Sequence, residues 1–342
     1  MIRIFLVFLA IGLPLLVASE DCNIRQFFEF KYKYNKIYEH AFEEHRRCAI
    51  FTKKLNEINK RSKVLLAAKI SFMEGINEFS DLTKDEFRKQ YTGLARSNET
   101  MNPITDKKEI SKTLFKILPE NWDSGYDELD LRVPQIHAKN QKPCGACWAF
   151  TATGVYEYYL YKKFGFVYDL SEQMSVDCVK KFACTTGGQS WEAFNYFLNN
   201  GVDFTSVYPW VGVDKKCNYR DTSDPANGLS KNFATQWHAA PSDETYLAYM
   251  LEAVGWISVT ISADPIEHYQ SGIIPGSHCH GEVNHAVILV GYGTDQKTGT
   301  KYWILRNSWG PHWGEEGYFR IERGVNACEI ANNYDNERTY LE

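Results

Sequence analysis

The chain lacks an excess of basic residues. Its 342 residues include 38 lysines and arginines against 43 aspartates and glutamates, a formal net charge of -5, and its pI is near 6.0. A nucleic-acid partner requires a concentrated basic surface that neutralises phosphates, so this composition gives no support for one. Internal repeats and low-complexity tracts are also missing. With 44% hydrophobic and 15% aromatic residues, we expect a globular protein with enough apolar side chain for two folding units.

Long hydrophobic runs are equally scarce. The one candidate spans residues 4–17, follows Arg3 and is interrupted by Pro14. It is shorter than the roughly 20 residues that a bilayer span requires, and its layout is that of a secretory signal peptide. We therefore expect residues 1–19 to be removed near Ser19. No membrane anchor is expected in the remainder, and an oxidising secretory compartment is its predicted environment.

Nine cysteines are an odd number for a secreted chain, in which cysteines usually pair. Cys22 and Cys48 lie early, and the other seven lie from Cys144 onward. Six of those seven can form three disulfides and leave one thiol. For Cys22 and Cys48, a mutual disulfide and two reduced thiols both remain open.

The first part of the chain, residues 21–108, is rich in lysine, arginine and glutamate. Its apolar residues recur at helical spacing, notably at Phe42, Ile50, Leu55 and Ile58. This spacing predicts an amphipathic helix of about five turns. Further on, Thr83 and Glu86 form a capping-box pattern that predicts the start of a short helix.

A polar stretch from Ala95 to Lys112 is the candidate linker, and Asn98 within it is a candidate glycosylation site because Asn98-Glu99-Thr100 fits the acceptor pattern. Residues 118–342 contain 17 basic and 28 acidic side chains, a net charge of -11, whereas residues 1–117 carry +6. Opposite charges favour docking of the first segment on the second, with release as carboxylates protonate at low pH. Ordinary surface variation is the alternative explanation.

The second segment predicts helices first and strands later. Helices are expected over residues 147–163 and 191–198, each ending near a glycine. Short runs of β-branched and aromatic residues predict strands at 256–261, 285–290, 301–306 and 317–321. This order indicates an α+β fold in two halves.

A thiol, an imidazole and two amides form the candidate catalytic set. Cys147 lies at the expected first turn of a helix, where unpaired N–H groups and the macrodipole favour a thiolate. His285 begins a strand-like run and can complete an ion pair with it. Asn307 can orient the imidazole, and Trp309 can shield that bond from water. Gln141, together with the Cys147 N–H, can stabilise an oxyanion.

The run Cys-Gly-Ala-Cys-Trp at residues 144–148, with His285 and Asn307 downstream, resembles the signature of papain and the cathepsins. The histidine follows Cys147 by 138 residues, within the usual range, and the asparagine follows by 160, slightly beyond it. A loop insertion would account for the difference.

The earlier segment extends this resemblance. Residues 75–81 match the Gly-x-Asn-x-Phe-x-Asp motif of papain-type pro-regions. Four residues match the helical motif of cathepsin L-like propeptides, namely Glu43, Arg47, Phe51 and Ile58. Lys54 and Ser62 replace the two asparagines of that motif.

The resemblance implies a cathepsin L-like cysteine endopeptidase made as an inactive precursor. Its parts would be a signal peptide (1–19), a helical inhibitory propeptide (20–117) and a papain-like peptidase domain (118–342) with a helical left and a β-barrel-like right half. It implies no cofactor. The expected partners are protein and peptide substrates, the chain's own propeptide as inhibitor, and cystatin-type inhibitors. We expect a monomer with a lysosomal or extracellular destination.

The resemblance also assigns residues. It pairs Cys144 with Cys184, Cys178 with Cys217 and Cys279 with Cys328, which leaves Cys147 as the thiol. The implied substrate-binding residues are Gly187, Gly188, Gln189, Ser190, Thr260, Asn284, Ala286, Trp309 and Asn333. The selectivity pocket among them, formed by Gln189, Ser190, Thr260, Ala286 and Asn333, is more polar than is usual in the family. This argues against a simple preference for large aliphatic side chains.

The sequence leaves open a metal site and two rival functions. His278 and His280 flank Cys279 and suggest zinc, but they lack a third ligand, so a solvated loop is favoured. No paired-histidine insertion of the cathepsin B type is visible, which favours endopeptidase over exopeptidase activity. A catalytically silent homologue that binds or inhibits, and a peptide ligase using the same thioester, are the rival functions.

Overall fold

The computed structural model describes residues 22–95, 129–218, 224–231, 237–239, 242–331 and 339–341. The expected signal peptide, the candidate glycosylation site Asn98, the expected start of the peptidase domain near residue 118 and the pocket residue Asn333 lie outside these ranges. No helix of the described ranges is both long and apolar enough to cross a membrane.

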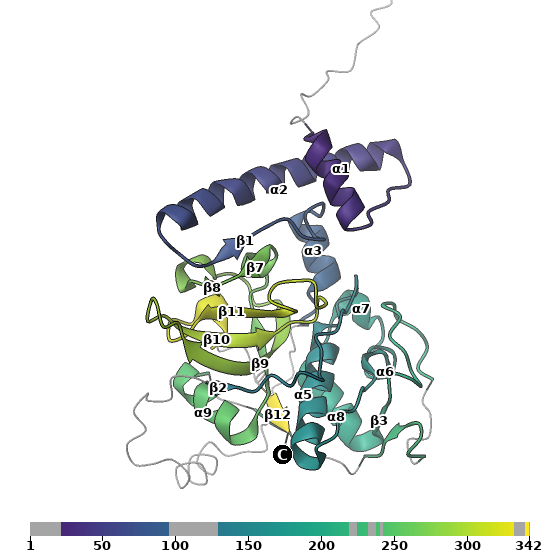
Figure 1. Cartoon of the computed structure of the whole chain (residues 1–342). Coiled ribbons are helices and arrows are strands. Elements are labelled where there is room, and N and C mark those ends of the chain that lie inside the picture. Colours follow the sequence, from purple (N-terminus) through teal and green to yellow (C-terminus); the bar gives the residue numbers. More distant parts are fainter. Residues whose placement is uncertain are drawn as a thin grey trace, which may run out of the picture.

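Three helices form the first segment: α1 (Ile24–Lys33), α2 (Ala41–Ala67) and α3 (Lys84–Tyr91). The predicted five-turn helix is too short, because α2 continues for 27 residues. Phe42 is 81% exposed, contrary to its expected place on the buried face. The reason is that α1 covers α2 only further along, where Phe51 and Leu55 pack with α1 residues around Phe27. Figure 1 shows these two helices crossing at the top of the molecule.

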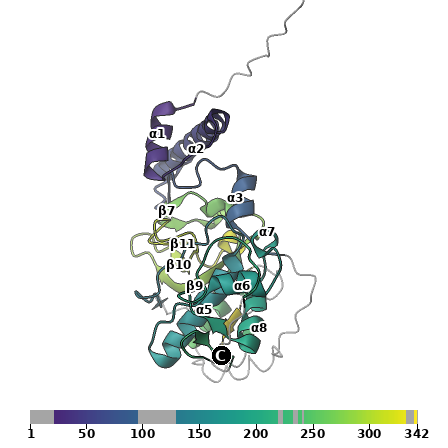
Figure 2. The ribbon, with the colours of Figure 1, turned by 90° about the vertical axis from the view of Figure 1, so that its right-hand side faces the viewer.

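The predicted capping box is confirmed at the start of α3. The Glu86 N–H donates to the Thr83 hydroxyl oxygen at 3.2 Å, and the Thr83 N–H donates to a Glu86 carboxylate oxygen at 2.8 Å. In Figures 1 and 2, α3 lies between α2 and the body of the molecule.

The helical half is built around α5 (Cys147–Phe164), which ends at Gly165 with φ of +75°. Its other elements are α6 (Glu172–Cys178), α7 (Ala183–Thr186), α8 (Ser190–Asn200), β3 (Val202–Asp203) and β4 (Gly228–Leu229). The helices predicted over residues 147–163 and 191–198 are confirmed. Most of α5 is buried on all sides, because it lies between this half and the sheet.

The other half is an eight-stranded sheet, mostly antiparallel. The strands follow the order β5-β12-β6-β9-β10-β11-β8, and β2 pairs with β9. Their bounds are β2 (Leu129–Asp130), β5 (Trp237–Ala239), β6 (Ile257–Ile261), β8 (Ile273–Ile274), β9 (His285–Thr294), β10 (Lys301–Arg306), β11 (Tyr318–Glu322) and β12 (Thr339–Leu341). The four predicted strands correspond to β6, β9, β10 and β11 and are confirmed. Helix α9 (Glu244–Val254), which contacts β9, was not predicted.

The first segment is joined to the sheet half by a small two-stranded sheet. Strand β1 (Met73–Glu74) pairs antiparallel with β7 (Tyr269–Ser271). The sheet half also contains three short 3-10 helices, at Asp264–Ile266, Gly276–His278 and Ala327–Glu329. The two halves keep separate hydrophobic cores, and α5 meets β9 between them. The first residues of these two elements are Cys147 and His285.

Candidate active site

The thiol of Cys147 lies against the beginning of β9. The backbone N–H of Ala286 donates to the Cys147 sulfur at 3.4 Å, and the Cys147 side chain is fully buried. Pairing of β6 with β9 fixes this strand in place, with His285 opposite Ile261. Two residues that are 138 positions apart in the chain thus share one site because a helix start faces a strand start.

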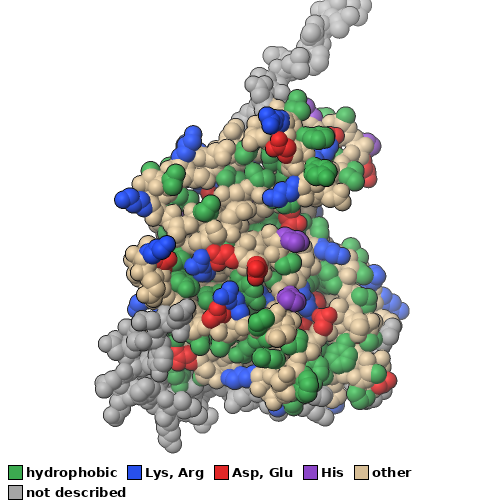
Figure 3. Space-filling view, viewed as in Figure 1, with side chains coloured by type: hydrophobic (Ala, Val, Ile, Leu, Met, Phe, Trp, Pro, Cys, Tyr) green, Lys and Arg blue, Asp and Glu red, His purple; other side chains and the backbone are tan. Residues whose placement is uncertain are grey.

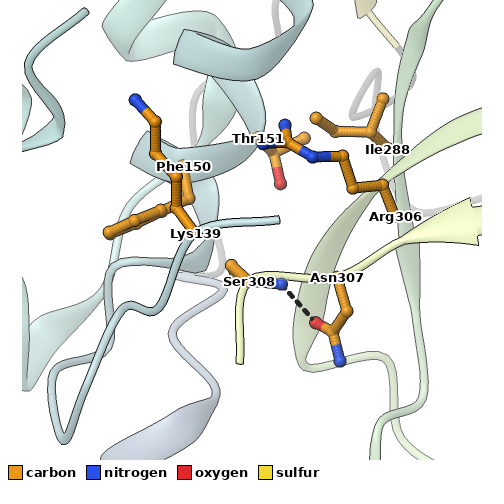
Figure 4. A pocket seen from close by; sticks show the side chains of 7 residues that line it. All are labelled: Lys139, Phe150, Thr151, Ile288, Arg306, Asn307 and Ser308. Carbon is orange, nitrogen blue, oxygen red and sulfur yellow. Dashed lines mark hydrogen bonds between the residues drawn. The ribbon is translucent and has the colours of Figure 1, made fainter. Parts of the chain in front are cut away.

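The imidazole of His285 is held by an amide and an indole. Its Nε2 lies 2.8 Å from Asn307 Oδ1, and the Trp309 ring stacks on it with centroids 4.9 Å apart. Asn307 Oδ1 also accepts the Ser308 N–H at 2.8 Å (Figure 4). Because Asn307 Oδ1 can only accept, Nε2 of His285 carries the proton and Nδ1 of the neutral ring does not. Nδ1 forms no hydrogen bond with any described residue.

Burial controls the charge of this imidazole. It lowers the pKa of His285 to about 4, and the hydrogen bond to Asn307 opposes the shift only in part. A neutral imidazole is therefore favoured at neutral pH while the ring is covered.

Gln141 is positioned by a residue that sequence analysis missed. The Ser308 hydroxyl donates to Gln141 Oε1 at 2.6 Å, so the amide NH2 points the other way. That NH2 donates to the carbonyl oxygens of Cys144 at 2.8 Å and Tyr91 at 3.2 Å. The Trp309 indole N–H donates to the same Tyr91 oxygen at 3.1 Å. In the sequence, the only indication of a role for Ser308 was that its hydroxyl is adjacent to Asn307.

The segment after α3, residues 92–95, lies in the site between Gly188 and Asn284. The Gly188 N–H donates to the Gly93 oxygen at 2.9 Å, and the Ala95 N–H donates to the Gly188 oxygen at 3.2 Å. Leu94 and Gly188 form a parallel bridge. On the opposite wall, the Asn284 carbonyl accepts the N–H groups of Gly93 at 3.3 Å and Leu94 at 3.2 Å.

Glycines allow this close approach. A Cβ on Gly93 would overlap the Gly145 carbonyl, and a Cβ on Gly187 would overlap the Gly93 carbonyl. Gln189 adds a side-chain contact, since its Nε2 donates to the Ala95 oxygen at 2.9 Å. Gly187, Gly188, Gln189 and Asn284 therefore contact or crowd this segment, and Trp309 contacts Tyr91 just before it.

The remaining predicted pocket residues lie in the wall. Thr260 pairs with Ala286 across β6 and β9, and both are buried. The Ser190 hydroxyl donates to the Trp148 carbonyl at 3.2 Å and receives a hydrogen bond from Ser258 at 3.0 Å. The hydroxyl of Ser190 is therefore already used by the wall, which makes the pocket less polar than its composition suggests.

A small cavity behind Asn307 is not a substrate site. Its volume is about 10 Å³, and it is lined by Lys139, Phe150, Thr151, Ile288, Arg306, Asn307 and Ser308 (Figure 4). That volume holds one water at most. The segment after α3 lies against Gly188 and Gln189 and does not enter this cavity.

The cysteines form four disulfides, and Cys147 remains a thiol. The pairs are Cys22–Cys48, Cys144–Cys184, Cys178–Cys217 and Cys279–Cys328. The first pair decides between the two alternatives that the sequence left open. Within the described ranges no group of three or more histidine, cysteine, aspartate or glutamate side chains is arranged to hold a metal ion.

Comparison with known proteins adds an independent finding. Residues 118–337 match the family described as papain family cysteine protease, and residues 27–87 match the cathepsin propeptide inhibitor domain. Human cathepsin L2 is 34% identical over 94% of this chain and 94% of its own length. Fruit bromelain of Ananas comosus is 32% identical over 91% of this chain and 85% of its own length. The solved procathepsin L2 of Tenebrio molitor larval midgut superimposes with a TM-score of 0.79 at 29% identity, covering 93% of this chain and 99% of that one.

Proposed function

The chain belongs to the papain family of cysteine proteases and is a zymogen whose own inhibitor domain precedes the peptidase, and we propose that Cys147 is its nucleophile. The observation that carries the proposal is the contact between Cys147 and the strand that begins with His285, together with the bond from His285 to Asn307. A thiol at a helix start, beside an oriented imidazole, is the arrangement that activates a cysteine.

In the proposed reaction, the Cys147 thiolate attacks the carbonyl carbon of the scissile bond. The negative oxygen that forms accepts hydrogen bonds from Gln141 Nε2 and the Cys147 N–H. His285 then donates its proton to the leaving amine, and a thioester remains. Water hydrolyses the thioester with His285 as base. Asn307 keeps the imidazole oriented throughout.

The pro-segment explains why the precursor would be silent. Its Tyr91 carbonyl accepts the Gln141 amide proton that we assign to the oxyanion, and its Gly93–Ala95 stretch occupies the backbone of Gly188. The leaving amine must lie near His285 and Trp309, so the acyl part of a substrate lies toward Gly188 and Gln189. The pro-segment would then run opposite to a substrate, which protects its peptide bonds.

Removal of the pro-segment would also change the charge of the site. The covered His285 has a lowered pKa because it is buried. Exposure to solvent removes the cause of that shift, so the pKa of His285 rises and the thiolate–imidazolium pair becomes accessible. Release of the inhibitor would therefore both open the cleft and charge the catalytic pair.

Four disulfides and the cathepsin relationship indicate the secretory pathway. Within it we propose a lysosomal or extracellular endopeptidase that acts on proteins and peptides. Cystatin-type inhibitors are proposed as further partners, because they would enter the same cleft after the propeptide has left.

The test compares the full-length precursor with its Cys147→Ala variant after acidification. We expect the wild type to be trimmed near residue 118 and to hydrolyse members of a peptide library, while the variant stays intact and inactive. A His285→Ala variant should bind thiol-directed alkylating agents but fail to turn over. Undiminished activity of Cys147→Ala would refute the nucleophile assignment.

A further inference from the structure

A groove on the helical half lies outside the cleft that the pro-segment fills. Its volume is about 650 Å³, and the Cys178–Cys217 disulfide lies in its wall. Two lysines on each side surround it: Lys180 and Lys181 precede α7, and Lys215 and Lys216 precede Cys217. We call these four residues the lysine groove. Figure 3 shows basic side chains at the right-hand margin, beside the region where Figure 1 draws α7.

The acidic residues in this groove are already used by the protein. Asp177 Oδ1 accepts the Lys215 N–H at 2.7 Å, and its Oδ2 accepts the Tyr208 hydroxyl at 2.8 Å. Asp214 Oδ1 accepts the Cys184 N–H at 3.0 Å. These carboxylates hold the groove in shape.

The lysine ammonium groups, by contrast, are available. Lys180 lies 3.8 Å from Glu192, a long contact. Lys181, Lys215 and Lys216 are exposed and form no ion pair with any residue of the described ranges. A positive surface on the segment whose net charge is -11 is a local exception that attracts anions.

An aromatic side chain is displayed beside the lysines. Phe182 is 69% exposed, and its backbone has φ of +58°, a conformation that a bulky residue rarely adopts. Its carbonyl caps α7 by accepting the N–H groups of Thr185 at 3.0 Å and Thr186 at 2.8 Å. The cap explains the backbone but leaves the ring in solvent, where it offers an apolar contact.

The lysine groove adjoins the acyl end of the cleft. Helix α7 has only four residues and leads from Phe182 to Gly187–Gln189, where the pro-segment stretch Gly93–Ala95 is bound. A substrate chain that leaves the cleft past Gln189 and follows α7 would meet the lysines with residues that lie N-terminal to those bound at Gly188.

We propose that the lysine groove is an extended substrate subsite for acidic residues that lie N-terminal to those bound at Gly188. The proposal rests on the function proposed above, because that function sets the direction of the substrate. A peptide fits better than a sulfated polysaccharide, since α7 links the groove to the cleft residues Gly187–Gln189 and Phe182 offers an apolar surface that a peptide side chain can cover.

The experiment uses mature enzyme obtained by activation of the full-length chain. Three quenched fluorescent peptides share one cleavage sequence and carry Glu-Glu, Ser-Ser or Lys-Lys at the fourth and fifth positions before it. Exposed ion pairs are individually weak, so we expect about a tenfold higher kcat/KM for Glu-Glu than for Ser-Ser, mainly through KM and declining with added salt.

The triple variant Lys181→Ser, Lys215→Ser, Lys216→Ser should lose this preference and keep its rate on the Ser-Ser peptide. The matched control is Lys297→Ser, Lys301→Ser, two exposed lysines at the β9–β10 hairpin, which should keep the preference. Circular dichroism of each variant checks folding. Equal rates on the three peptides, or a preference that survives the triple variant, would overturn the proposal.

Two outcomes distinguish this proposal from a polyanion-binding site and from failure of the proposed protease function. Binding of a heparin-type polysaccharide that is lost in the triple variant, without any peptide preference, would assign the groove to polyanions and refute the peptide subsite. If none of the three peptides is hydrolysed, the protease function fails instead. In that case fluorescence anisotropy of the Glu-Glu peptide, measured after thiol blocking with methyl methanethiosulfonate, still tests the lysines: binding that does not depend on them contradicts the proposal.

Discussion

The side-chain amide of Gln141 donates a hydrogen bond to the backbone carbonyl of Tyr91, at 3.2 Å. The donor belongs to the peptidase and the acceptor to the inhibitor segment. We have assigned the same donor to the oxyanion, so inhibition and catalysis compete for one N–H group. The zymogen thereby keeps the donor satisfied while the cleft is closed.

Gln141→Ala should lower kcat of the mature enzyme by roughly 10²–10³-fold, the usual cost of removing one oxyanion donor, with little change in KM. Steady-state kinetics on one peptide would measure this. Ser308→Ala is the graded comparison: it removes the bond that orients Gln141 and should cost less. An unchanged kcat in Gln141→Ala would exclude this amide from the transition state.

Asn307→Ala should lower kcat more than it raises KM. The loss should be smaller than the roughly 10²–10⁴-fold that general acid–base catalysis contributes, because His285 is still present but less well oriented. A pH–rate profile is the discriminating measurement, since loss of the 2.8 Å bond changes the protonation of His285 as well as the rate. A variant with the wild-type rate and profile would show that Asn307 has no orienting role.

Asp264 should control the acid release of the propeptide. Burial alone would raise the pKa of Asp264, but hydrogen bonds from Arg88 and Lys84 outweigh it, so the pKa lies below its ordinary value of 3.8. The carboxylate therefore stabilises docking above that ordinary value, and the stabilisation is lost as the pH falls through the lowered pKa. Asp264→Asn should shift the midpoint of precursor processing to higher pH.

The control for this shift is Asp295→Asn, in the β9–β10 hairpin away from the propeptide helices. It should leave the midpoint unchanged.

Glu267, paired with Lys54, acts in the opposite direction: burial raises its pKa to about 7 against the attraction of Lys54. A raised pKa favours the docked state below its ordinary range and weakens it as the pH rises through 7. If Asp264→Asn leaves the pH midpoint of precursor processing unchanged, Asp264 does not stabilise the docked propeptide in the way described.

The Cys22–Cys48 disulfide should strengthen the inhibitor domain. It links residues 26 positions apart beside the small core of α1 and α2. A loop of that length is worth roughly 3 kcal/mol, a large share for a domain with so few core residues. The double variant Cys22→Ser, Cys48→Ser should activate faster and at higher pH, by gel densitometry over time, with mature kinetics unchanged. Identical activation would show that the disulfide does not limit release.

Gly93→Ala should weaken autoinhibition without touching the mature enzyme. The added Cβ would overlap the backbone carbonyl of Gly145, which cannot move aside as a flexible side chain would. Overpacking of this kind costs about 1–3 kcal/mol, or roughly 5- to 140-fold in affinity. Inhibition of mature enzyme by the separately added propeptide measures it. Lys89→Ala, at an exposed position of α3, is the matched control and should inhibit normally.

Some of these features were available from local sequence. The capping box at Thr83 and Glu86, the helix that starts at Cys147 and the strand that starts at His285 all depend on neighbouring residues, and each was predicted correctly. Helix α9 was not, because its apolar residues give no clear face until they are packed against the sheet. Phe42 was misplaced for the same reason: helical spacing tells which residues share a face, but not which part of the face another helix covers.

Short stretches of the sequence were sufficient to predict what kind of site this chain contains. One odd cysteine at a helix start, with a histidine and an asparagine far downstream, was enough to predict a thiol site within an α+β fold. The long-range contacts became visible in the folded chain: Ser308 donates to Gln141, and Ser190 donates to the Trp148 carbonyl. Cys22 pairs with Cys48, and the Tyr91 carbonyl accepts from Gln141. Each of these is a contact between residues distant in the chain, and such contacts exist only once two separately folded cores and the inhibitor segment have been packed together.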